Sequence, residues 1–405
     1  MKTLISQHIF NSNILRILFA TCLSALCLIA LSAEAATITV INTLDGGPGS
    51  LRQALADAND GDTIGFDASL NAIGVFSGEL VVDKSVTISG RGAANLFVYN
   101  NYLSRVFHIT NAVTVSISGL TIQNGIAFDR GGGGILNDHS TLTVSNCTIR
   151  SNQVIYPDSG GGICNDGSFG SASLEINNSS VIYNGADDSG GGIYNNGVSG
   201  SATLTINNSS VSGNGVGNAG GGIYNDGSEG GSATLTINNS TVSGNSANSG
   251  GNSANFGGGI FNYADFGGSA TLTVSDSTIS GNSVAGFYGA SGGGGIHNVG
   301  RFSGSATLTV TNSTLSGNSA DHGGGIYNDA HIGEGAMLEI GNTILKTGSS
   351  GANIYNPEGT VTSLGYNLSN DNGGGFLTAT GDQINTDPLL GPLQDNGGPT
   401  FTMRS

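Results

Sequence analysis

Carboxylates recur at one position of a repeated segment in this chain. The position follows the asparagine that closes a glycine-rich hexad such as "GGGIYN", and it holds Asp138, Asp166, Asp226 and Asp329. Asp138 and Asp166 belong to successive repeats, so stacking of the repeats would make them neighbours whose oxygen atoms could hold Ca²⁺. Turn chemistry is the alternative that we prefer, because Asn-Asp-Gly is a turn signal. We therefore expect no metal or other cofactor, with calcium at Asp138 and Asp166 as the exception to test.

The residue after the hexad isoleucine is aromatic in most repeats. This column holds Leu136, Cys164, Tyr194, Tyr224, Phe261, His297, Tyr327 and Tyr355. Strand alternation puts it opposite the isoleucine, so we expect a ladder of rings that faces outward. Such a ladder could stack on sugar rings or on a partner surface; the candidates for ligand stacking are Tyr194, Tyr224, Phe261, Tyr327 and Tyr355. The interpretation that we prefer is ring stacking that only stabilises the strands.

Groups that could perform catalysis are sparse. A lyase that acts on uronic acids needs a basic residue beside clustered acids, and no Lys or Arg lies between Arg150 and Arg301. A hydrolase needs only two suitably spaced carboxyls, so hydrolysis is the less excluded alternative. His108, His139, His297, His322 and His331 show no paired metal spacing, and we expect them to be solvated turn residues. We predict no catalytic residues.

These residues sit in a repeat of about thirty residues. The hexad isoleucines are Ile135, Ile163, Ile193, Ile223, Ile260, Ile296, Ile326 and a degenerate Ile354. Periods of 20 to 50 residues indicate a solenoid or a propeller. Two repeats carry extra residues, at Asn248–Phe256 and Val284–Gly292, and insertions at one place in a solenoid gather on one face. A binding site, if present, is expected there.

Each repeat contains three short strands and no helical pattern. Two aliphatic columns two residues apart give the strand period: Leu142, Leu174, Leu204, Leu235, Leu272, Leu308 and Leu338, then Val144, Ile176, Ile206, Ile237, Val274, Val310 and Ile340. A further column follows a polar break at Ile149, Val181, Val211, Val242, Ile279, Leu315 and Leu345. A propeller blade needs four longer strands and an aromatic signature. We predict an all-β, right-handed parallel β-helix in which the columns become buried rows.

Asparagine and glycine mark the corners of the predicted coils. One column holds Asn146, Asn178, Asn208, Asn239, Asp276, Asn312 and Asn342; another holds the hexad residues Asn137, Asn165, Asn195, Asn225, Asn262, Asn298, Asn328 and Asn356. Stacked amides can hydrogen-bond along the pile, and asparagine tolerates the left-handed conformation of a sharp corner. The same residues spell glycosylation sequons, but corner geometry explains their period without a glycan. Glycine triplets would allow coils to approach closely.

The N-terminal segment has the features of an export signal. Two positive charges precede an apolar run at 17–31, and "AEA" at 33–35 offers a small-residue cleavage site. We predict that residues 1–35 are removed, that no transmembrane helix is retained, and that the mature chain is extracellular or on the cell surface, associated with an outer membrane. A net charge of −17 excludes nucleic acid as a partner. Pairing of Cys147 with Cys164 stays open, because an even count does not show that they meet.

A short amphipathic helix is expected to cap the first coil. Ser50 and Gln53 have the spacing of a capping box, and Leu51, Ala54 and Leu55 form an apolar stripe. The cap would cover strand edges that could otherwise pair with other chains.

The chain resembles exported right-handed β-helix repeat proteins of the pectate-lyase-like superfold, including polymorphic outer membrane proteins. The resemblance rests on the repeated "GGGIYN" and "LTINNSTVSGN", on "TLDGGPGSLRQALADANDGDTIGF", and on "DPLLGPLQDNGGPTFT", which is similar to a tail module that precedes bacterial surface anchors. Hydrolases of the superfold carry "NTD", "GDD", "GHG" and "RIK"; here only "NTD" occurs, at Asn385–Asp387. The resemblance implies an architecture more than an activity.

Four segments and two functions follow from these observations. The segments are the signal peptide at 1–35, a cap with irregular first coils at 36–110, the repeats at 111–370, and a tail at 371–405 that we expect to be truncated. The first hypothesis is a non-enzymatic surface protein for adhesion or envelope contact, with a glycan or a host or neighbouring cell surface as partner. The alternative is a polysaccharide-active enzyme, a hydrolase more than a lyase.

Overall fold

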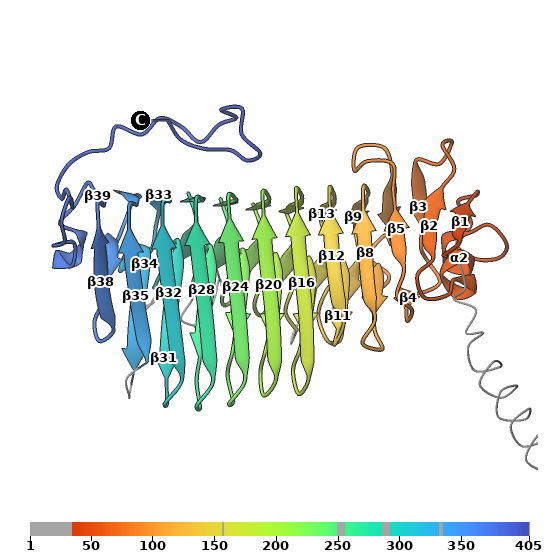
Figure 1. Ribbon diagram of the computed structural model, residues 1–405, viewed down its shortest axis with the longest axis horizontal. Coiled ribbons are helices and arrows are strands. Elements are labelled where there is room, and N and C mark those ends of the chain that lie inside the picture. The colour runs from red at the N-terminus through yellow and green to blue at the C-terminus, as the bar shows by residue number, and fades with distance from the viewer. Residues whose placement is uncertain (1–34, 156–157, 249–255, 286–291, 332–334, 405) are drawn as a thin grey trace, which may run out of the picture. The chain divides into compact units, whose positions relative to one another are not determined.

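The structure is a computed structural model that describes residues 35–155, 158–248, 256–285, 292–331 and 335–404. From Thr37 onward the chain winds into a right-handed parallel β-helix, which confirms the predicted fold (Figure 1). Neighbouring strands of a sheet come from successive coils and are parallel. For example, β16 (Ser171–Asn177) pairs in register with β20 (Ser201–Asn207).

Within the described ranges the strands form four parallel sheets, which we name A to D. Sheet A holds β1 (Thr37–Val40), β2 (Thr63–Phe66), β5 (Thr87–Ser89), β8 (Thr114–Ser118), β12 (Thr141–Ser145), β16, β20, β24 (Ser232–Asn238), β28 (Ser269–Ser275), β32 (Ser305–Thr311), β35 (Ala336–Gly341) and β38 (Thr360–Gly365). Sheet B holds β3 (Ala72–Gly74), β6 (Phe97–Tyr99), β9 (Thr121–Gln123), β13 (Thr148–Arg150), β17 (Ser180–Ile182), β21 (Ser210–Ser212), β25 (Thr241–Ser243), β29 (Thr278–Ser280), β33 (Thr314–Asn318), β36 (Ile344–Thr347) and β39 (Leu368–Ser369).

Sheets C and D complete the coils. Sheet C holds β4 (Leu80–Val82), β7 (Phe107–Ile109), β11 (Ile135–Asp138), β15 (Ile163–Asp166), β19 (Ile193–Asn196), β23 (Ile223–Asp226), β27 (Ile260–Ala264), β31 (Ile296–Arg301), β34 (Gly323–His331) and β37 (Ala352–Tyr355). Sheet D holds β10 (Ile126–Ala127), β14 (Gln153–Val154), β18 (Gly185–Ala186), β22 (Gly215–Val216), β26 (Ser246–Asn248) and β30 (Ser283–Ala285). The expectation of three strands per repeat was thus incomplete, because the short strands of sheet D carry too few apolar residues to show a period.

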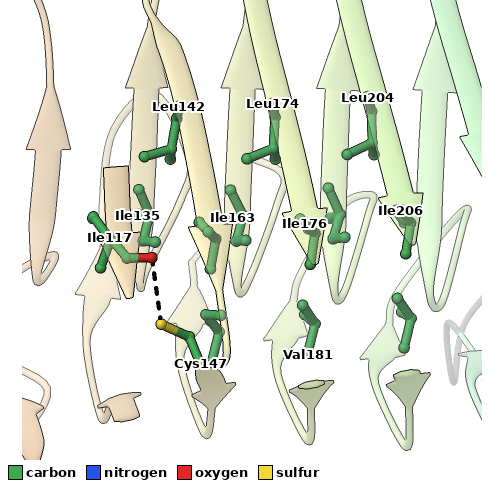
Figure 2. Packing of buried hydrophobic residues seen from close by; sticks show 14 of the residues in the cluster. Ile117, Ile135, Leu142, Cys147, Ile163, Leu174, Ile176, Val181, Leu204 and Ile206 are labelled. Atoms are coloured by element: carbon green, nitrogen blue, oxygen red, sulfur yellow. Dashed lines mark hydrogen bonds between the residues drawn. The ribbon is translucent and has the colours of Figure 1, made fainter. Parts of the chain in front are cut away.

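The predicted aliphatic columns form the core, as Figure 2 shows for several coils. Leu174 pairs with Leu204 and Ile176 with Ile206, and none of the four side chains is more than 1% exposed. Burial of one such side chain stabilises the fold by about 1.5–3 kcal/mol, and each coil buries several of them against its neighbours. The buried rows are therefore the main force that holds the stack together.

Both predicted roles of asparagine are confirmed. The corner residues of the first column have φ between 46° and 53°, in the left-handed region. The hexad asparagines are buried except for the half-buried Asn356 and form one amide ladder, in which each side-chain nitrogen donates to the side-chain oxygen of the next coil at 2.6–2.7 Å. Asn137 begins this ladder, and its buried Oδ1 has no partner within the described residues.

A second amide ladder was missed in the sequence. It consists of the asparagine in "SGN" and its equivalents: Asn152, Asn184, Asn214, Asn245, Asn282 and Asn318. Successive side chains are joined by hydrogen bonds of 2.9–3.1 Å, and each side chain is buried. The recurrence of this asparagine at intervals of about thirty residues would have been enough to predict the ladder.

The glycine triplets allow the close approach that was predicted. In the hexad "GGGIYN" that contains Ile193, Gly190 has φ of 62°, which glycine adopts without strain. A Cβ atom at Gly191 would lie 2.3 Å from the carbonyl oxygen of Gly215 and 2.6 Å from that of Gly221. A side chain there would push the next coil away.

The cap helix is present as α2 (Leu51–Asp57). Ser50 is the N-cap and its side chain accepts from the Gln53 backbone at 3.2 Å, but the Gln53 side chain donates to Asp57 at 2.8 Å. The capping box is therefore only half formed. The coils before residue 111 extend the sheets of the repeats without a break.

The two cysteines of the described chain are buried and unbonded to each other. The Cys147 thiol donates to the carbonyl oxygen of Ile117 at 3.6 Å, as drawn in Figure 2. Burial raises the pKa of Cys147 to about 11, and it raises the pKa of Cys164 further. Both thiols are thus kept neutral in the folded chain.

The end of the chain forms a small hairpin. After the 3-10 turn η1 (Gly373–Gly375), the backbones of Gln394 and Thr402 exchange hydrogen bonds of 3.0 Å in each direction. The hydroxyl of Thr241 in β25 donates to the carbonyl oxygen of Phe401 at 2.8 Å. The hairpin therefore contacts the outer face of sheet B.

Candidate functional site

Asp138 and Asp166 are neighbours, as their column predicted, because β11 and β15 pair in register. Both are buried, and the Arg130 guanidinium lies across them: its nitrogens are 2.6 and 2.8 Å from the Asp138 carboxylate and 3.1 Å from Asp166 Oδ2. Burial would raise the pKa of Asp138, but hydrogen bonds from Arg130 and His139 hold it at about 2. The oxygens that could hold a cation are therefore engaged by a guanidinium.

A wider ion network surrounds this pair in the first regular coils. His108 joins two carboxylates, with Nδ1 2.9 Å from Glu79 Oε1 and Nε2 3.3 Å from Asp138 Oδ2. Arg105, which is 5% exposed, forms an ion pair with Glu79 and donates to backbone carbonyls of the next coil. Burial opposes ionisation of Glu79, yet the bond from His108 and the charge of Arg105 lower its pKa.

His139 extends the network toward the next corner. Its Nδ1 is 2.5 Å from Asp138 Oδ1, and its Nε2 is 2.7 Å from the carbonyl oxygen of Ser168. Burial would lower the pKa of His139, but these two acceptors raise it. The expectation of a solvated turn residue was therefore wrong for His108, which lies in β7, whereas His139 occupies a corner with φ of 54° and 37% of its side chain exposed, although both of its ring nitrogens are bonded.

The network suits a structural role better than proton transfer. A general acid needs a group that holds a proton near the working pH, whereas Asp138 and Glu79 are ionised and paired with guanidinium groups. Within the described ranges no group of three or more His, Cys, Asp or Glu side chains could hold a metal ion. The network fastens the coils of β4, β7, β11 and β15 to one another.

The remaining aspartates of the column lie apart from this network. Asp226 is buried beside the ring ladder, where burial raises its pKa although Ser228 donates to it. Asp329 lies 3.6 Å from the guanidinium of Arg301. Neither is paired with another carboxylate of the column. The register partners of Asp226 are Asn196 and Tyr263, and the partner of Asp329 in the preceding coil is Val299.

The aromatic column forms a continuous stack on sheet C. Ring centroids of successive coils are 4.5–5.2 Å apart from Tyr194 through Tyr355. The interplanar angles range from 16° to 56°, so each ring covers part of its neighbour. The predicted ladder is confirmed as a stack.

The ladder is less exposed than predicted. Phe261 is 5% exposed and His297 is 0% exposed, and Tyr194 and Tyr224 are half-buried. Ala219, Phe256 and Tyr263 pack against it and cover its central part. Strand alternation correctly put these side chains outside the coil, but it could not show that a further layer covers them.

Polar groups of the ladder are also enclosed. The Tyr194 hydroxyl donates to Asp226 Oδ2 at 3.1 Å. Burial lowers the pKa of His297, whose ring nitrogens have no partner within the described part of the chain, so the expectation of a solvated turn histidine was wrong here too. Tyr355 is the exception at the end of the stack, with 38% of its surface exposed. Tyr327 and His322 stack on this ring with centroids 5.2 and 5.0 Å away, so the ladder offers little free aromatic face to a sugar even there.

Exposed aromatic rings occur instead at corners of the coils, which sequence reasoning missed. Phe169, Phe266 and Phe302 occupy equivalent corners between sheets C and A, with φ of 57°, 43° and 46°. They are 82%, 61% and 42% exposed. The left-handed conformation costs a residue with a large side chain roughly 1–2 kcal/mol, and the intervening coils place Ser199 and Glu229 at this corner.

Two of these rings form a pair. Phe266 and Phe302 stack with centroids 5.0 Å apart and planes 9° apart. We call the exposed surface that these two rings form the rim. Contiguous exposed apolar surface often marks a site of contact with another molecule. The signal in the sequence was a phenylalanine four residues after the hexad asparagine.

Some predicted features fall largely outside the described residues. The insertions at Asn248–Phe256 and Val284–Gly292 are described only at their edges, where Phe256 packs on Phe261 with centroids 5.7 Å apart. The predicted signal peptide is described only at Ala35. No helix among the described residues is long and apolar enough to span a membrane.

Comparison of the chain with protein-family models and with curated proteins finds no match. The interpretation of its surface therefore depends on the geometry of its own residues.

Proposed function

We propose that this chain is an exported surface protein whose β-helix serves adhesion or envelope contact without catalysis. The resemblance to pectate-lyase-like and polymorphic outer membrane proteins supports this proposal through the repeats, the signal segment and the tail. The observation that carries it is the stacked pair of Phe266 and Phe302, which keeps two rings in solvent at left-handed corners. A structural role alone would be served by serine at the same corner, as in the coil of Ser199.

The ion network supports the same proposal. The carboxylates of the network, those of Glu79, Asp138 and Asp166, all accept from arginine or histidine side chains. A polysaccharide lyase or hydrolase needs carboxyl groups free to exchange protons with a substrate. We find no observation that favours the enzymatic alternative over the surface-contact role.

Export is tested by expressing the full chain in a Gram-negative host. The expected product is in the outer membrane or the medium and has Ala36 as its N-terminal residue by peptide sequencing. An uncleaved chain in the cytoplasm would contradict the proposal.

Surface contact is tested with the mature chain coated on beads and offered to Gram-negative envelopes and to epithelial cells. The double variant Phe266→Ser, Phe302→Ser should lose most of the retention, while Leu364→Ser, which removes a 52% exposed side chain elsewhere, should keep it. Equal retention of both variants, or none by the parent, would contradict a contact role for the rim.

The enzymatic alternative is tested on the same preparation. Pectate, alginate and neutral plant polysaccharides with Ca²⁺ should yield neither unsaturated products nor new reducing ends. Turnover above a heat-killed control that disappears in Asp166→Asn would replace the proposed function.

A further inference from the structure

A groove on sheet B, distant in sequence from the Phe266–Phe302 rim, forms a second site. It lies over the outer face of β17, β21 and β25, and residues 399–401 of the tail hairpin close one side. Its volume is about 670 Å³, within the range of 300 to 1,000 Å³ that is usual for small-ligand sites. The hydrogen bond from Thr241 to the carbonyl oxygen of Phe401 fixes the hairpin over this face.

Tyr183 lines the groove from a left-handed corner at which the next coils have glycine. It has φ of 55° and is 69% exposed, whereas the next coils place Gly213 and Gly244 at the same corner, with φ of 64° and 62°. A Cβ atom at Gly213 would lie 2.6 Å from Tyr183 Cε1, so the ring lies along the space that a side chain there would fill. Strained backbone conformations cluster at ligand clamps and other functional sites.

The lining of the groove is uncharged. Hydroxyl groups come from Ser180 and Ser210 on two successive strands, with further hydroxyls from Ser212 and Ser243, while the buried Thr241 hydroxyl is taken up by Phe401. Asn178 and Asn208 add amides, and Phe401 adds a second aromatic ring to the lining. None of the lining residues is Asp, Glu, Lys, Arg or His.

This chemistry matches a neutral saccharide. Aromatic faces attract the C–H groups of a sugar ring through their negative quadrupole, and neutral hydroxyls and amides can pair with sugar hydroxyls in either direction. The strand rows repeat about every 4.8 Å, which is close to the length of one sugar residue in an extended chain. An anionic ligand would find no counter-charge in the groove and would be repelled by the acidic chain.

We propose that the groove between Tyr183 and Phe401 binds a short neutral oligosaccharide along the rows of β17, β21 and β25. The proposal does not depend on the contact role of the rim, because the two surfaces share no residue. Loss of binding at one surface therefore leaves the other unaffected.

Calorimetry with the mature chain tests the proposal, using the tetrasaccharides of cellulose, starch and xylan, with tetragalacturonate as the anionic comparison. At least one neutral tetrasaccharide should bind, and tetragalacturonate should bind at least tenfold more weakly. Tyr183→Gly restores the glycine of the neighbouring coils, so it should fold at least as stably as the parent and lose about tenfold in affinity. Phe169→Gly, the matched loss of an exposed left-handed ring at another corner, should leave the affinity unchanged.

Several results would overturn the proposal. These are the absence of binding by every neutral tetrasaccharide, equal affinity for tetragalacturonate, and unchanged affinity in Tyr183→Gly. Phe401→Ala should weaken binding; tighter binding in this variant would show that the tail itself occupies the groove, which also contradicts the proposal.

Discussion

Replacement of Asn225 by leucine should show how much the hexad amide ladder stabilises the β-helix. Asn225 is 0% exposed; its side-chain oxygen accepts from Asn195 at 2.7 Å, and its nitrogen donates to Asn262 at 2.7 Å. Leucine has a similar volume but no polar atom. The variant Asn225→Leu therefore leaves the Asn262 acceptor buried without this donor, while Asn195 Nδ2 keeps only its longer bonds to the carbonyl oxygens of Ala202 and Thr234.

The expected loss follows from one stranded acceptor and one lost hydrogen bond. A buried polar group without a partner costs about 1–3 kcal/mol and a lost hydrogen bond about 1 kcal/mol, which gives about 2–4 kcal/mol, and the added apolar contact offsets about 1 kcal/mol of this. We expect the free energy of unfolding to fall by about 1–3 kcal/mol, measured by urea titration followed by circular dichroism.

A corner asparagine provides the control. Asn208 has φ of 49°, which glycine adopts freely, and its oxygen accepts one exposed hydrogen bond from Asn239. Asn208→Gly should change the free energy of unfolding by less than about 1 kcal/mol. If the leucine variant is as stable as this control, the buried ladder does not stabilise the fold and the reasoning is wrong.

Three further predictions concern the core, the ion network and the thiols. Ile206→Asp should lower the melting temperature strongly, because burial of an unpaired charge costs several kcal/mol, while Thr203→Asp on the exposed face of the same strand should not; equal melts would contradict the assigned faces. The pKa of Asp138 is about 2 in the folded chain, below its ordinary value of 3.8, so its pairing stabilises the fold above about pH 4 and this stability is lost as the pH falls toward 2. Arg130→Gln should flatten this part of the stability curve, and an unchanged slope would contradict the pairing. Cys147 should resist alkylation in the native chain and react in urea; rapid native labelling would show that the thiol is accessible.

The fold could be predicted because each repeat encodes the same register. The two-residue alternation of Leu204 and Ile206 identified a strand and its buried face, and recurrence after thirty residues identified the neighbour in the stack. The left-handed corners followed from asparagine at a fixed place in every coil. These properties depend on local conformation and on contacts between equivalent residues, both of which a repeat displays directly.

The surface could be predicted only in part. The ring ladder was found, but the side chains that cover Phe261, those of Ala219, Phe256 and Tyr263, stand at positions whose residue type changes from coil to coil, so no period reveals the layer. Likewise, the partners of His108 come from Glu79 and Asp138 in the preceding and following coils, and Glu79 lies in an irregular coil that does not align with the repeats. Contacts of this kind depend on the folded path of the chain rather than on a local pattern.

A residue that departs from the repeat should therefore be assigned a function only after asking whether contacts within the fold offset its backbone strain. Arg130 and Tyr183 both have positive φ, at 52° and 55°, so each carries a similar backbone strain. For Arg130 the strain is offset within the fold, because its guanidinium binds two buried carboxylates. Tyr183 keeps most of its ring in solvent, at a corner where glycine would remove the strain. A costly residue whose side chain remains exposed gains most from a molecule outside the fold, which is why we assign ligand binding to Tyr183 and structure to Arg130.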